Sequence, residues 1–221
     1  MTGQAKRILG IAVCTVLLFV GLGLYIGLYL TNVPGSVAAT TSSSGTHLYL
    51  ATVPAAELND PHPTWVSYYA VNADGGNWRH DTTYVLPANT LVHVTIYQYD
   101  GDSGLRNPFL SQSQGTTGGD FTLNGKPTRA IDPDDASHIF AIPNIGLSVP
   151  LEGVPATAKN PCANAPCTLA QDHETISFSF RTPGRGLYRW QCFVPCAAGF
   201  IAGFGGPMQT VGYMDGYIKV V

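Results

Sequence analysis

Two pairs of closely spaced cysteines are the residues of this sequence best suited to chemistry. Cys162 and Cys167 lie in a proline-flanked loop with no His, Asp or Glu between them, which predicts a local disulfide that staples the loop. Cys192 and Cys196 follow an expected strand and open a Gly-rich segment. Their spacing leaves two alternatives open, a second disulfide or a pair of free thiols.

Motifs that would indicate an enzyme are missing from the sequence. It contains no G-x-S-x-G, no H-E-x-x-H and no G-x-x-x-x-G-K pattern. Asp132, Asp134 and Asp135 form an acidic cluster, but their spacing does not match an EF-hand loop, so a solvated turn is the better interpretation. We therefore expect no catalytic residues in this chain.

A long apolar run near the start of the chain predicts a membrane anchor. Residues 8–30 carry no charge and could span a bilayer as a helix. Lys6 and Arg7 precede the run, and the next basic residue is Arg79, so the positive-inside rule places residues 1–7 in the cytoplasm. The chain is then a single-pass protein of the cell membrane with its C-terminal domain on the extracytoplasmic side. The alternative is a signal peptide cleaved near residues 37–39.

Composition and charge exclude several classes of protein. Of the 221 residues only 11% are charged, whereas 45% are hydrophobic and 25 are glycine, which is unlike a coiled coil or a charged disordered chain. The formal net charge is −3, and Lys6 and Arg7 are two of the 11 basic residues, so the rest of the chain has nine bases against 14 acids. This acidic balance disfavours nucleic acid as a partner.

The chain beyond the apolar run reads as one all-β domain. Residues 31–45 are small, polar and uncharged, and we expect a flexible tether there. Residues 46–221 contain short runs of β-branched and aromatic residues between turn residues, several with period-two alternation. The expected strands are 47–53, 65–71, 91–97, 138–142, 175–180, 187–192 and 217–221. Seven or eight strands with long Gly/Pro-rich connections predict a Greek-key β-sandwich; the insertion at 100–135 should form a small hairpin near Phe121–Leu123.

Three stretches resemble the cupredoxins, and in particular the copper-bearing (CuA) domain of cytochrome c oxidase subunit II. The first is the His138 strand, read as H-x-F-x-x-P-x-x-G. The second is Tyr188-x-x-x-Cys192-x-x-x-Cys196, which is similar to the paired cysteines of the CuA site. The third is the Met214–Val220 segment, which resembles the axial Met and last strand of blue copper proteins. Subunit II usually has two membrane helices, whereas this chain has one candidate.

This resemblance implies copper as the cofactor and a metal site made of His138, Cys192, Cys196 and an axial Met214. Such a protein would transfer electrons in or beside a respiratory chain, with a respiratory membrane complex or a soluble electron-transfer protein as partner, and would not be an enzyme by itself. The ligand set departs from the family pattern, because Phe200 stands where the CuA pattern has its second His, and no His follows His173. His93 or His173 could complete the set, Gln209 could add a weak oxygen ligand, and surface roles are the default for the remaining histidines.

Two alternatives follow from this departure. A sulfur-rich set with one imidazole favours Cu(I), so the chain could carry copper to an oxidase. If Cys192 and Cys196 are oxidised to a disulfide, the domain is a metal-free scaffold that acts as an accessory subunit of a membrane complex.

Overall fold

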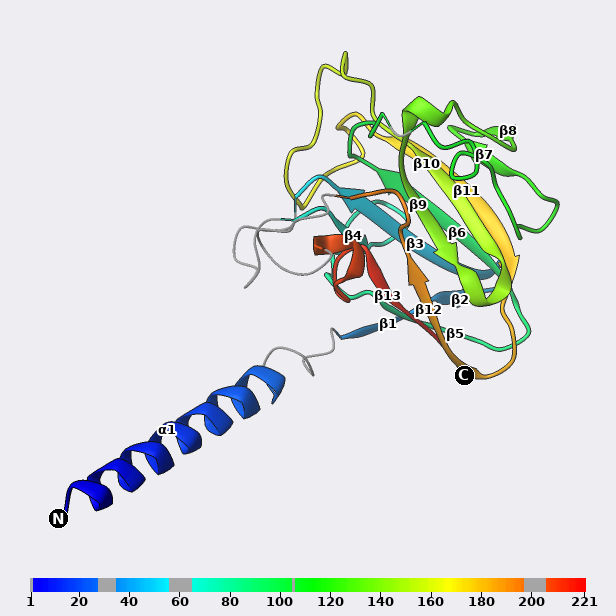
Figure 1. Cartoon of the computed structure of the whole chain (residues 1–221). Helices are drawn as coiled ribbons and strands as arrows, with labels where there is room; N and C mark the ends of the chain where they lie inside the picture. Colours follow the sequence, from blue (N-terminus) through cyan, green and yellow to red (C-terminus); the bar gives the residue numbers. More distant parts are fainter. Residues whose placement is uncertain (1, 28–34, 56–64, 105, 197–205) are drawn as a thin grey trace. The chain divides into compact units, whose positions relative to one another are not determined.

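The computed structural model describes residues 2–27, 35–55, 65–104, 106–196 and 206–221 (Figure 1). Contacts within the chain divide it into an N-terminal unit and a β unit that begins at Pro34.

The N-terminal unit contains one helix, α1 (Gly3–Tyr25). The hydroxyl of Thr2 caps the helix by accepting a hydrogen bond from the amide of Ala5, so the helix begins before the predicted span of residues 8–30. None of its residues is buried. Among the described residues it is the one helix long and apolar enough to cross a membrane, and its length and composition fit a span or a signal sequence alike. Residues 28–30 of the predicted span lie outside the described residues.

The β unit consists of two sheets, which confirms the predicted all-β sandwich. The first sheet has the order β1 (Ser36–Ala38), β5 (Thr83–Leu86), β13 (Asp215–Val220), β12 (Gly186–Gln191), β9 (Ala136–Ile142) and β10 (Leu147–Glu152). The second has the order β2 (Thr40–Ser42), β3 (Gly45–Val53), β6 (Leu91–Gln98), β11 (Glu174–Arg181), β7 (Phe121–Leu123) and β8 (Lys126–Thr128), and β4 (Ser67–Ala70) pairs with β3. Strands distant in sequence are neighbours in both sheets, as Greek-key connections require.

Alternating side chains explain why β3, β6 and β11 form the centre of the second sheet. In β6, Val92, Val94 and Ile96 are buried, whereas the residues between them at the start of the strand are half-buried. β11 alternates in the same way and pairs antiparallel with β6. The buried faces of the two sheets enclose one core around Trp190, which is fully buried and donates its indole N–H to the Thr82 carbonyl.

The β unit contains more strands than its sequence predicts. All seven predicted strands are present, but the described residues contain 13, because the short strands β5, β7 and β8, the proline-containing β10, and β1 and β2 are added. β1 and β2 correct the predicted tether at 31–45. Ser36–Ala38 pairs with β5 and Thr40–Ser42 pairs with β3, so these small polar residues are ordered by neighbouring strands. Residues 31–34 lie outside the described residues.

The insertion at 100–135 contains the predicted hairpin, formed by β7 and β8. It ends in a short 3-10 turn, Pro133–Asp135, which Asp132 caps by accepting a hydrogen bond from the Asp134 amide at 3.0 Å. The acidic cluster is thus a capped turn.

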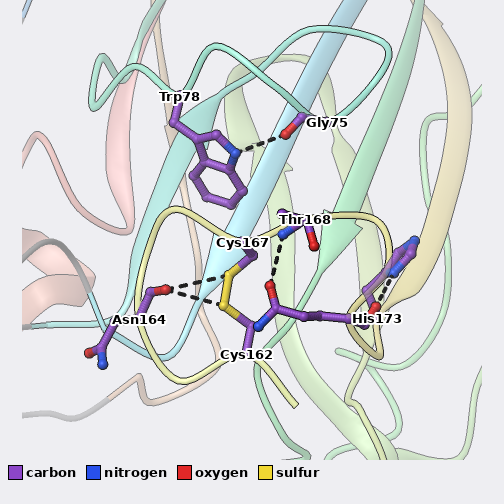
Figure 2. Close-up of a disulfide and its surroundings, with 8 residues drawn as sticks. Gly75, Trp78, Cys162, Asn164, Cys167, Thr168 and His173 are labelled. Carbon is purple, nitrogen blue, oxygen red and sulfur yellow. Dashed lines mark hydrogen bonds between the residues drawn. A yellow bond between two sulfur atoms is a disulfide. The ribbon is translucent and has the colours of Figure 1, made fainter. Parts of the chain in front are cut away.

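The predicted disulfide between Cys162 and Cys167 is present. Figure 2 shows the loop that it closes, with Trp78 and His173 nearby. Both cysteines are buried in a second, smaller hydrophobic cluster, against which Trp78 packs while its indole N–H donates to the Gly75 carbonyl at 2.8 Å. This staple fixes a surface loop and leaves the other cysteine pair independent of it.

Candidate metal centre

Three neighbouring strands of the first sheet position the candidate ligands. Cys192 directly follows β12 and Met214 directly precedes β13. Because β12 and β13 pair antiparallel, these two residues meet, and the Cys192 amide donates to the Met214 carbonyl at 2.9 Å. β9 lies on the other side of β12 and carries His138. The sheet order therefore brings together residues that lie far apart in the sequence.

The ligand atoms of His138, Cys192 and Cys196 converge at one buried point. The imidazole Nδ1 of His138 lies 3.0 Å from the Cys196 Sγ and 3.9 Å from the Cys192 Sγ. The two sulfurs are 3.1 Å apart. The three residues are at most 5% exposed, and their ligand atoms all lie within 4.8 Å of one another, which is compact enough to hold a metal ion.

The two cysteines of this centre are not joined by a disulfide. A disulfide bond is about 2.05 Å long, so a separation of 3.1 Å leaves Cys192 and Cys196 unbonded. In this structure the metal-free scaffold with two oxidised cysteine pairs is not formed. The two thiols and one imidazole remain available as soft and borderline ligands.

Groups around the ligands hold them in place. On the far side of the imidazole, His138 Nε2 lies 2.9 Å from the Asp100 Oδ2. The Ile139 amide donates to the Cys192 Sγ at 3.4 Å, and the Cys196 thiol lies 3.0 Å from the Val194 carbonyl. A carboxylate on the outer nitrogen of a metal-binding histidine fixes the orientation of the ring and directs the other nitrogen at the metal.

The same contacts separate the pKa values of the three groups. Burial by itself disfavours the imidazolium of His138, but the hydrogen bond to Asp100 and the interaction with Cys192 raise its pKa to about 9. Burial also opposes ionisation of Cys192, yet hydrogen bonds from Cys196 and His138, the imidazolium charge and the Ile139 amide lower its pKa to about 5. The hydrogen bond with Cys192 and burial raise the pKa of Cys196, which keeps its proton. Near neutral pH the centre therefore holds a thiolate beside an imidazolium.

Aromatic side chains surround the centre on its inner side. Tyr68 is fully buried, packs against Trp190 with ring centroids 4.7 Å apart, and donates its hydroxyl to the Ile139 carbonyl at 3.1 Å. Burial and then the charge of Cys192 raise the pKa of Tyr68 well above its usual value. The aromatic packing closes the inner side of the centre to water and leaves a low-dielectric environment there.

Met214 is fully buried in the same core as the two cysteines, next to Cys192 through the backbone. Met208 is half-buried, and its carbonyl accepts from the Gln191 side chain. The side chain of Gln209 is exposed. Of the three residues near the expected fourth position, only Met214 lies in the core beside the thiols.

The histidines considered as a second imidazole ligand lie elsewhere. His93 Nδ1 contacts the Ser179 hydroxyl on the outer face of the second sheet, and His173 Nδ1 contacts the Gln171 carbonyl. Phe200, at the position of the second His in the CuA pattern, lies outside the described residues. Within the described part of the chain, one imidazole and two sulfurs make up the only group of three or more His, Cys, Asp or Glu residues with the spacing of a metal site.

Asp100 is the residue of this site that the sequence analysis missed. It follows β6 at the start of the 100–135 insertion, 38 residues before its histidine partner. No spacing rule connects the two positions. The contact exists because the insertion starts at the same end of the sandwich as the cysteine pair.

Comparisons with known proteins give no match by sequence and distant matches by structure. No protein family and no curated protein matches the sequence. Among solved structures, the copper protein rusticyanin is 16% identical over 90% of this chain and 94% of its own, with a TM-score of 0.34. Auracyanin B is 16% identical over 86% of this chain and 99% of its own (TM-score 0.30), and a chain of a heme-copper terminal oxidase dimer is 13% identical over 99% of both (TM-score 0.28). At these identities the likeness concerns the fold alone.

The sandwich and the buried His/Cys/Cys group together define a two-sheet β protein with a site that could hold a metal ion.

Proposed function

We propose that this chain is a membrane-anchored copper protein that carries electrons in or beside a respiratory chain. Copper would be held by the Nδ1 of His138 and the sulfurs of Cys192 and Cys196, with Met214 as a weaker fourth ligand. The observation that carries the proposal is the convergence of one imidazole nitrogen and two unbonded sulfurs at a buried point. A metal held there would supply one-electron redox chemistry.

The donor set fits copper by its chemistry. Copper binds thiolate and imidazole ligands, whereas the harder cations Mg²⁺ and Ca²⁺ prefer oxygen ligands. The lowered pKa of Cys192 means that one sulfur is already ionised in the metal-free chain. The Asp100 carboxylate accepts from the Nε2 side of His138, which leaves Nδ1 facing the sulfurs once the ring is neutral. The burial of the ligands limits rearrangement when the metal changes its charge.

The anchor and orientation complete the proposal. Helix α1 would hold the domain at the cell membrane, with Lys6 and Arg7 on the cytoplasmic side and the β unit outside. The Cys162–Cys167 disulfide is consistent with an oxidising, extracytoplasmic compartment. The partner would then be a respiratory membrane complex or a soluble electron-transfer protein outside the cytoplasm.

A second function is favoured by the missing imidazole. Within the described residues the site offers two sulfurs and one imidazole, which stabilises Cu(I) more than Cu(II). A Cu(I) carrier that delivers copper to an oxidase would need tight cuprous binding and no reversible colour change. This distinction makes the two functions separable by spectroscopy.

The deciding measurement is copper content, visible absorption and free-thiol count on the full chain purified from its membrane. The electron carrier predicts bound copper and a thiolate-to-Cu(II) absorption band after oxidation, both lost in Cys192→Ser. The Cu(I) carrier predicts bound copper without a band under oxidising conditions. Cys14→Ser removes a thiol outside the β unit and serves as the matched control, which should keep the copper.

The thiol count distinguishes both functions from a metal-free scaffold. The metal-free, unreduced chain should show three free thiols, from Cys14, Cys192 and Cys196. A single free thiol together with no copper would overturn the proposal and indicate an accessory subunit without metal.

A further inference from the structure

A second pair of candidate ligands lies on the outer face of the second sheet. His47 on β3 and His93 on β6 are direct register partners in the parallel pairing of these strands. Ser179 on β11 is in turn the register partner of His93. His47, His93 and Ser179 thus form one polar row across three adjacent strands.

The two rings are close and one of them is oriented. Their centroids are 5.1 Å apart with an interplanar angle of 28°. His93 Nδ1 lies 2.8 Å from the Ser179 hydroxyl, and no described residue forms a hydrogen bond with His93 Nε2. When Nδ1 carries the proton and donates it to the serine oxygen, Nε2 has a free lone pair. In this tautomer the ring can bind a metal ion through Nε2.

Both Nε2 atoms lie close to Gly45. A Cβ built on Gly45 would lie 3.4 Å from the Nε2 of His93 and 3.8 Å from that of His47. The glycine has a φ of +122°, a conformation that side chains rarely adopt, so a side chain at this position beside the two rings is disfavoured. Ser44 closes one side, with its hydroxyl 3.2 Å from the His47 Nε2.

Above the row lies a cavity of about 470 Å³ that the two histidines line together with residues of the 100–135 insertion. Asp120, one of these lining residues, adds a carboxylate to the cavity. A cation bound at this row would therefore meet two imidazoles and a hydroxyl, in a cavity whose wall also carries the negative charge of Asp120. This combination matches the preference of divalent ions such as Cu²⁺, Ni²⁺ and Zn²⁺ for imidazole with oxygen ligands.

We propose that His47 and His93 form a second metal site, which binds a divalent transition-metal cation through their Nε2 atoms and is independent of the cysteine centre. Ser179 acts as a positioning residue that orients the His93 ring.

Strand geometry separates the two sites. His47 lies near the start of β3, whereas Thr52 near its end pairs with Tyr68, the residue that bonds to the Ile139 carbonyl beside His138. Five strand residues correspond to roughly 17 Å at about 3.3 Å each. The histidine pair can therefore be occupied whether or not the cysteine centre holds copper.

The test uses the full chain in detergent with Cys192→Ser and Cys196→Ser, so that added Cu(II) is neither bound nor reduced by the thiols. Cu(II) titration is followed by calorimetry and by electron paramagnetic resonance. We expect one equivalent of Cu(II) to bind with a nitrogen-coordinated spectrum. Ser179→Ala should weaken binding by about tenfold, as loss of a group that orients a ligand does, and His47→Gln or His93→Gln should weaken it further.

His173→Gln is the matched control, because His173 is also a half-buried histidine of the β unit but lies outside this row. Its Cu(II) binding should equal that of the parent. Binding that is absent, or that survives both His47→Gln and His93→Gln, would overturn the proposal. If the double cysteine variant does not fold, the Cu(II) stoichiometry of the parent chain gives the same decision. The second site predicts two equivalents for the parent and one fewer for His93→Gln. An unchanged stoichiometry in His93→Gln overturns the proposal.

Discussion

The ionisation of the cysteine centre offers a sharp prediction through Asp100. The pKa of His138 is raised from 6.5 to about 9, and Asp100 makes the largest of the contributions that raise it. At 1.36 kcal/mol for each pH unit, the net stabilisation of the imidazolium is roughly 3 kcal/mol. Replacing Asp100 by Asn keeps the size of the side chain and removes its charge. We expect the pKa of His138 to fall by about one pH unit or more, since a single carboxylate at hydrogen-bond distance has an effect of this size.

The change should be visible at Cys192, which ionises because the imidazolium is close. The ultraviolet absorbance of the thiolate in the reduced, metal-free chain should titrate with a midpoint of about 5. In Asp100→Asn the midpoint should rise, because a less basic His138 stabilises the thiolate less. A Cys14→Ser background removes the signal of the remaining free thiol outside the β unit.

Asp102→Asn is the matched control for this experiment. Asp102 is an exposed carboxylate two residues from Asp100, and among the described contacts only Asp100 bonds to the imidazole. The reasoning is refuted if the parent thiolate titrates near the ordinary cysteine value of about 8.5, or if Asp100→Asn and Asp102→Asn give the same midpoint.

Three further predictions concern stability. The pKa of Cys192 is lowered to about 5, so its contribution to the free energy of unfolding is lost as the pH falls toward 5. The raised pKa of His138 gives a contribution that is present below pH 6.5 and is lost as the pH rises through 9. Between pH 6.5 and 5 only the Cys192 contribution changes, and urea denaturation of the metal-free chain should show a loss of about 2 kcal/mol that Cys192→Ser abolishes; a flat profile would contradict this. Gly216→Ala would push a methyl group against the Thr82 carbonyl, which directly precedes β5, and against the Trp190 indole. We expect the free energy of unfolding to fall by about 3 kcal/mol, or the chain not to fold, as measured by thermal unfolding. An unchanged stability would show that the strand shifts to make room. Arg189→Ala leaves the carboxylate of Asp215 buried without its ion-pair partner. The free energy of unfolding should fall by about 2 kcal/mol, less than for a fully buried pair because Arg189 is half-exposed. An unchanged value in urea denaturation would show that water replaces the guanidinium.

Much of the β unit could be predicted from local patterns. The strands β3, β6 and β11 follow from period-two alternation, because one face of each is buried. β1 and β2 could not be predicted in this way, since Ser36–Ala38 and Thr40–Ser42 have the composition of a linker. Their hydrogen bonds are supplied by β5 and β3, and a sequence window contains no information about those partners.

The candidate site shows the same division. The sequence by itself determined which residues could bind a soft metal, because the types and spacing of Cys192, Cys196 and His138 are local features. Only the tertiary structure decided that the two sulfurs are unbonded thiols, that Nδ1 of the histidine faces them, and that Asp100 holds its other nitrogen. Charge states depend on burial and on partners distant in the chain, and these arise only when the strands pack into sheets.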